Sequence, residues 1–180
     1  MTSTAKIATA RSQSIVAAET DQAAPAFAEL YRRHVNQVFY YLYSRVRDTH
    51  EAEDLTSQTF ITALESFHQL RDKGKFVPWL FTIARNKATD HFRQQKRRPI
   101  TTLDEELAPS ALKTEPRDHD RLIELERLIQ SLDAREQEYL RLRLVADLPF
   151  AQIAVILRQP ETRIKKSYYR LLERLQAQVE

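Results

Sequence analysis

The sequence predicts an all-α protein made of two small helical domains joined by a flexible linker, the C-terminal one containing a helix-turn-helix. Apolar residues recur at helical spacing through most of the 180 residues. Glycine occurs once, at Gly74, where average usage would give about a dozen. Parallel α/β folds, sandwiches and phosphate-binding loops depend on glycine, whereas short connections between helices do not. The composition therefore favours helices alone.

The first domain is predicted over residues 25–98, after an N-terminal extension, 1–24, that is small and polar and is predicted to be disordered. Apolar periodicity predicts three helices in this domain, over residues 27–46, 51–67 and 78–95. The third begins at Pro78, and proline suits the first turn of a helix. The loop LRDKGKFVP, which holds the glycine, separates the second and third helices.

Residues 99–117 contain three of the seven prolines and an acidic cluster, which indicates a linker. The second domain is predicted over residues 118–180. Asp133 and Glu136 have the spacing of a capping box, so a helix is expected to begin there and to run to Val145. Two further helices are predicted over residues 150–157 and 160–178, with a short turn between them that lacks glycine.

Several classes of protein are excluded or disfavoured by composition. Cysteine is absent, which removes disulfides and thiolate metal sites and fits a reducing compartment. No apolar run approaches the roughly 20 residues that span a bilayer, and the N-terminus lacks the apolar core of a signal peptide. The five histidines show no metal-binding spacing. We therefore expect a cytoplasmic protein without membrane insertion, catalytic residues, bound metal or cofactor.

The last predicted helix separates an apolar arc, which runs from Ile164 to Leu175, from a basic one. The polar residues of the basic arc and its flanks are Thr162, Arg163, Lys165, Lys166, Ser167, Tyr169, Arg170 and Arg174. A solvated charged face is the common alternative, but such faces usually alternate in sign. The short apolar helix before this one favours a helix-turn-helix that reads the major groove of DNA.

A second basic face is predicted on the helix after the loop. Residues 25–98 carry thirteen basic and eight acidic side chains, so the positive charge is concentrated there. One face combines cations with hydrogen-bonding side chains, namely Thr82, Arg85, Asn86, Thr89, Arg93 and Lys96. Lys73 and Lys75 precede it beside Phe76 and Trp79, whose rings could stack on unpaired bases or belong to the core. The cationic face favours nucleic acid.

The chain resembles bacterial sigma factors of the extracytoplasmic-function (ECF) type, in the sigma-70 family. Their first conserved domain is similar to FAELYRRHVNQVFYYLYSRV, AEDLTSQTFITAL and FVPWLFTIARNKATDHFR. Their second domain is similar to LDAREQEYLRLRLVADLPFAQIAVIL and TRIKKSYYRLLERL. Together these stretches cover nearly all of the chain outside the extension and the linker.

The resemblance implies an alternative sigma factor that directs transcription initiation of a specialised stress or envelope-type regulon. It implies binding to core RNA polymerase, on the beta-prime clamp helices and the beta subunit, and to an anti-sigma factor. The residues that match the clamp-docking stretch are Asp54, Leu55, Gln58, Thr59 and Phe60. The helix predicted over residues 78–95 and the loop before it match the minus-ten reader, which contacts duplex DNA and the melted non-template strand. The last helix matches the minus-thirty-five reader.

Two alternatives stay open at this point. A sigma-like mimic would sequester an anti-sigma factor without touching DNA, and it would not need the two basic faces. A stand-alone helix-turn-helix regulator would bind operators unaided, and it would need neither the EDLTSQTF stretch nor the reader helix of the first domain.

Overall fold

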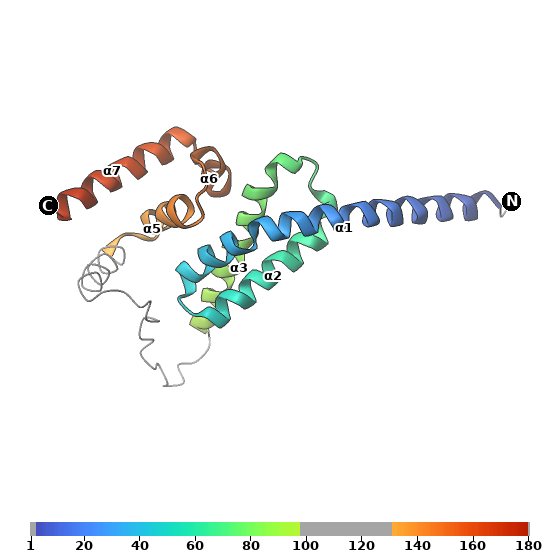
Figure 1. Cartoon of the computed structure of the whole chain (residues 1–180), viewed down its shortest axis with the longest axis horizontal. Helices are drawn as coiled ribbons and strands as arrows, with labels where there is room; N and C mark the ends of the chain where they lie inside the picture. Colours follow the sequence, from blue (N-terminus) through green and yellow to red (C-terminus); the bar gives the residue numbers. More distant parts are fainter. Residues whose placement is uncertain (1–2, 98–130, 180) are drawn as a thin grey trace. The chain divides into compact units, whose positions relative to one another are not determined.

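The computed structural model describes residues 3–97 and 131–179, and it describes side chains over 25–97 and 131–177 (Figure 1). All regular structure in the described ranges is helical, as predicted. The chain divides into two compact units between Ala88 and Thr89, inside the third helix. The predicted linker and the start of the predicted second domain lie outside the described residues. No helix in the described part is both long and apolar enough to cross a bilayer.

The first two helices, α1 (Ser3–Val46) and α2 (Thr49–Ser66), pack against each other through a tight reversal (Figure 1). Arg47 takes a left-handed conformation, with φ of 59°, and its amide donates to the carbonyl of Tyr43 at 2.8 Å. Asp48 then caps α2, because its Oδ1 accepts the amide of Glu51 at 2.8 Å. A polar side chain at this position satisfies an amide that the helix itself leaves unpaired.

Helix α1 also covers the extension that the sequence indicated to be disordered. Residues 3–24 are helical in the structure. Alanine has the strongest helix propensity, and four alanines lie between residues 17 and 24. Pro25 interrupts the hydrogen bonding inside this helix. Proline has no amide hydrogen, and an interior proline costs about 3 kcal/mol relative to alanine.

Aromatic rings form the core of the N-terminal unit. Phe27 of α1 makes edge-to-face contacts with Phe60, Phe67 and Phe76, at centroid distances of 6.4, 5.3 and 6.3 Å. These partners lie on α2, on the short 3-10 helix η1 (Phe67–Gln69) and at the start of α3 (Phe76–Arg97). Each such pair contributes about 0.5–1.5 kcal/mol beyond burial of its area. One ring thus joins three elements of the unit.

The C-terminal unit begins with the predicted capping box, which is confirmed. Asp133 accepts the amides of Arg135 and Glu136, and Oε2 of Glu136 accepts the amide of Asp133 at 3.3 Å. Helix α5 (Ala134–Leu140) then continues as a π-helical turn, η3 (Arg141–Val145), that the sequence did not predict. The wider turn leaves Leu144 and Val145 exposed, at 62% and 40%.

The last two helices, α6 (Phe150–Leu157) and α7 (Glu161–Val179), pack against each other and against the preceding elements. Their shared core consists of side chains less than 2% exposed, namely Leu142, Leu148, Ile153, Ile164 and Leu171. Helix α7 begins one residue later than predicted. The carbonyl of Pro160 accepts the amides of Arg163 and Ile164, so this proline stands just before the helix.

Candidate functional site

The residues expected to contact the clamp helices fall on two faces of α2. Asp54 and Gln58 are exposed. Leu55, Thr59 and Phe60 are at most 4% exposed, because they face α1 and the rest of the core. The hydroxyl of Thr59 donates to the carbonyl of Leu55 at 2.7 Å, so its polar atom is also satisfied inside the protein. In this fold these three side chains therefore belong to the core and offer almost no surface to a partner.

The exposed face of α2 carries two apolar side chains that the sequence analysis did not assign to a site. Ile61 follows Asp54 and Gln58 at helical spacing and is 57% exposed. Leu64 lies three residues further along the helix and is 53% exposed. Large apolar side chains beside carboxylates on a helix surface are typical of a docking surface when they cluster. We call Asp54, Gln58, Ile61 and Leu64 the α2 surface.

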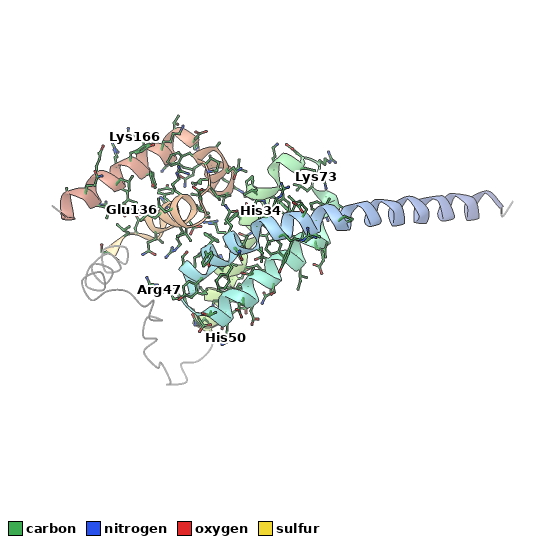
Figure 2. All side chains as sticks on the ribbon, viewed as in Figure 1. His34, Arg47, His50, Lys73, Glu136 and Lys166 are labelled. Atoms are coloured by element: carbon green, nitrogen blue, oxygen red, sulfur yellow. The ribbon has the colours of Figure 1, made fainter. Side chains whose placement is uncertain are left out.

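The loop before α3 is fixed by its own polar groups. Asp72 accepts the amide of Gly74 at 2.9 Å, and the Nζ of Lys75 lies 3.6 Å from its second carboxylate oxygen. A Cβ at Gly74 would come within 3.1 Å of the same carboxylate, so a larger residue would disturb this cap. The Nζ of Lys73 lies 3.5 Å from the ring centroid of Phe67, which is a cation–π contact. Lys73 and Lys75 are both exposed, and Figure 2 labels Lys73 in this loop.

The two aromatic residues at the start of α3 have different environments. Phe76 is 1% exposed and contacts Phe27 and Phe67, so its ring belongs to the core and is not available for stacking on a base. Trp79 is half-buried, with its ring 5.9 Å from that of Phe76. Trp79 is thus the aromatic side chain of this pair that a base could reach.

The basic face of α3 is partly accessible. Asn86, Arg93 and Lys96 are exposed, and Arg93 pairs with Asp90 at 3.4 Å. The hydroxyl of Thr82 donates to the carbonyl of Pro78 at 2.7 Å, which commits it to the helix. Arg85 and Thr89 are half-buried. The strongest accessible positive charge therefore lies toward the C-terminal end of α3.

Helix α7 presents three exposed cations on one face. Arg163, Lys166 and Arg170 follow each other at spacings of three and four residues, so they form one stripe. None of them forms an ion pair with another residue of the described ranges. Figure 2 shows Lys166 on the side of α7 that faces away from α5. We call these three residues the α7 stripe.

The other two cations of α7 are held by carboxylates. The Nζ of Lys165 lies 2.6 Å from Glu161, and this hydrogen bond raises the pKa of Lys165 above its ordinary 10.5. Arg174 lies 2.7 Å from Glu136, which projects from α5. The sequence placed all five cations on or beside one DNA-facing arc. The structure instead separates Lys165 and Arg174 from the α7 stripe, because each already has a partner.

The remaining predicted residues of α7 flank the stripe. Thr162 is exposed, Ser167 is half-buried, and Tyr169 is 54% exposed with its ring 5.9 Å from that of Phe150. Tyr168 faces the core, and burial raises the pKa of its hydroxyl. The helix therefore offers a basic stripe with hydroxyl and aromatic side chains beside it, which suits contacts to phosphates and base edges.

Comparison with known proteins assigns the chain to a family. A family model described as sigma-70 region 2 matches residues 30–98. The ECF RNA polymerase sigma factor BldN of Streptomyces coelicolor is 34% identical over 159 residues, which cover 84% of this chain and 60% of BldN. The ECF RNA polymerase sigma factor SigM of Bacillus subtilis is 29% identical over 153 residues, which cover 83% of this chain and 92% of SigM. The chain belongs to the ECF group of the sigma-70 family.

The fold of this sigma factor also has a counterpart among solved structures. The structure of CnrH in complex with the cytosolic domain of CnrY matches 89% of this chain and 94% of that chain, with a TM-score of 0.63 at 20% identity. Likeness at this identity shows a shared fold. The match to region 2 covers residues 30–98, so it includes the α2 surface, the loop before α3 and all of α3.

Sequence reasoning missed a few exposed residues of this sigma factor. Ile61 could have been found by extending the stripe of Asp54 and Gln58 by one helical turn. Leu144 and Val145 could not, because their exposure depends on the π-helical turn and ordinary α-helical periodicity does not indicate it.

Proposed function

We propose that this sigma factor binds core RNA polymerase, recognises the minus-ten and minus-thirty-five elements of promoters, and directs transcription initiation of a specialised regulon. It acts in the cytoplasm by binding and carries out no covalent chemistry of its own. An anti-sigma factor is its proposed regulator. The chain spans 60% of the length of BldN.

The observation that carries the proposal is the α7 stripe. Arg163, Lys166 and Arg170 are exposed and free of carboxylates within the described ranges, while Ile164 and Leu171 anchor the opposite side of the helix in the core. An anchored helix with one unneutralised cationic face fits the major groove, where arginine and lysine reach phosphates and guanine edges. This arrangement supports α6 and α7 as a helix-turn-helix.

The N-terminal unit supports two further contacts. The α2 surface combines exposed apolar and polar side chains, which suits docking on the clamp helices of the polymerase. Lys73 and Lys75 lie in the loop that Asp72 caps, and Trp79 follows it on α3. Cations and an aromatic ring suit an unpaired base of the non-template strand. Leu144 and Val145 offer an exposed apolar surface on the C-terminal unit for the beta subunit.

A run-off transcription assay with core polymerase tests the proposal. Transcripts that start at mapped promoters and require this chain are the expected result. Binding to an anti-sigma factor without core binding would indicate the mimic instead. Operator binding by the chain alone, with no polymerase-dependent transcript, would indicate the stand-alone regulator.

The α7 stripe is tested with a matched pair of substitutions. Lys166→Ala and Arg170→Ala should each weaken promoter binding by about 1–3 kcal/mol if they make base-specific contacts. Lys165→Ala is the control, because it removes the same charge from the same helix at a residue held by Glu161. Equal losses for Lys165 and Lys166, or no loss at Lys166 and Arg170, would contradict the assignment of this face.

A further inference from the structure

The turn between α6 and α7 contains an arginine in a backbone conformation that favours glycine. Arg158 has φ of 52° and ψ of 46°, in the left-handed region. The Cβ of an L-residue there approaches the following carbonyl, which glycine avoids because it has no Cβ. Helices commonly end with glycine in this conformation. The chain has an arginine instead.

The conformation of Arg158 is imposed by its neighbours. The amides of Arg158 and Gln159 donate to the carbonyls of Val155 and Ala154, at 3.3 and 3.1 Å, which closes α6. The hydroxyl of Tyr139 donates to the side-chain oxygen of Gln159 at 3.2 Å. Glycine would satisfy the same backbone hydrogen bonds without strain. The turn geometry therefore does not account for the arginine side chain.

The side chain of Arg158 has no structural role that the contacts explain. It is exposed, and its guanidinium makes no hydrogen bond, ion pair or ring contact with any residue of the described ranges. It lies three residues before Glu161, the first residue of α7. It adds an exposed cation in the turn that precedes the helix carrying Arg163, Lys166 and Arg170.

We propose that Arg158 binds a phosphate of the DNA backbone next to the element that α7 reads. A strained residue that persists without a structural contact is expected to be retained for a function, and an arginine side chain fits a phosphate in both charge and hydrogen-bond donors. The contact adds affinity without sequence preference and fixes the position of the turn against the duplex. This inference rests on the proposed role of α7 in DNA binding.

The test measures binding of the full chain to a short duplex of mixed sequence over a range of salt concentrations. Loss of one phosphate contact reduces the slope of log affinity against log salt by about 0.9, which corresponds to about a fivefold loss at ~0.15 M salt. Arg158→Gly should show this loss and a higher thermal unfolding midpoint, since the strain is relieved. Arg158→Lys keeps the charge and should keep the slope.

Two controls make the outcome decisive. Arg47→Gly removes a cation at the other left-handed arginine, at the end of α1, and should leave the slope unchanged. Lys166→Ala reports separately on DNA binding by α7. If Lys166→Ala lowers affinity but Arg158→Gly leaves both slope and affinity unchanged, the phosphate contact is refuted and the proposed function stands. If neither changes binding, the proposed function fails as well.

Discussion

Replacement of Glu136 by alanine is expected to lower the free energy of unfolding of the C-terminal unit by about 0.5–2 kcal/mol, because this carboxylate has two partners. Its Oε1 lies 2.7 Å from Nη2 of Arg174, and the two side chains are 22% and 50% exposed. A partly exposed pair of this kind contributes about 0.2–1 kcal/mol. Its Oε2 accepts the amide of Asp133, and a negative charge in the first helical turn adds about 0.3–1 kcal/mol.

Hydrogen exchange is the suitable assay, because the single tryptophan, Trp79, lies in the N-terminal unit and does not report on α5 and α7. Amide protection in these two helices gives the free energy of opening for the wild type, Glu136→Ala, Arg174→Ala and the double variant. The double-mutant cycle should give a coupling energy of about 0.5–1 kcal/mol between the two residues.

The variant Glu136→Gln separates the two partners. Glutamine keeps an oxygen that can accept the amide of Asp133 but removes the charge that binds Arg174, so an intermediate loss is expected. A coupling energy near zero, or a Glu136→Gln variant as stable as the wild type, would show that the ion pair does not join α5 to α7 and would refute this reasoning.

Three further outcomes are expected. Leu64→Ala should reduce the affinity for core polymerase in a pull-down or titration and change the free energy of unfolding by less than about 0.5 kcal/mol. Leu55→Ala, in the core, should lower the free energy of unfolding by about 2–5 kcal/mol in urea unfolding. Glu161 raises the pKa of Lys165, so their pair stabilises the fold below pH 10.5 and loses this effect as pH rises through the pKa of Lys165. The free energies of unfolding of the wild type and Glu161→Gln, measured against pH, should therefore converge above pH 10.5. Asp48→Ala should cost about 1 kcal/mol, measured by the thermal unfolding midpoint, through loss of the α2 cap.

Local features of the fold could be predicted because they depend on neighbouring residues. The capping box of Asp133 and Glu136 requires only the spacing of two side chains, and the structure confirms it. The loop around Gly74 and the helices on either side of it likewise follow from periodicity and from residues that interrupt helices. The predicted start of the third helix was wrong, because α3 begins at Phe76, two residues before Pro78. The helical class, the order of these elements and the family resemblance were all accessible from the sequence.

The availability of individual side chains could not be predicted in the same way. Lys165 and Lys166 are adjacent in the sequence, yet one is held by Glu161 and the other is free in the described part. Arg174 is paired with a residue 38 positions away, which no local pattern reveals. The burial of Phe76 likewise depends on rings from α1 and η1. Such features arise from tertiary packing.

Pro25 has a consequence for how the first helix could be shortened. Within α1 this residue leaves the carbonyl of residue 21 without its helical donor, so the helix is weakest there. A chain that began at residue 24 would instead place the proline in the first turn, where its missing amide hydrogen has no partner to lose and its fixed φ favours the helix. The same residue that weakens a long helix would then serve as a well-formed start for a short one.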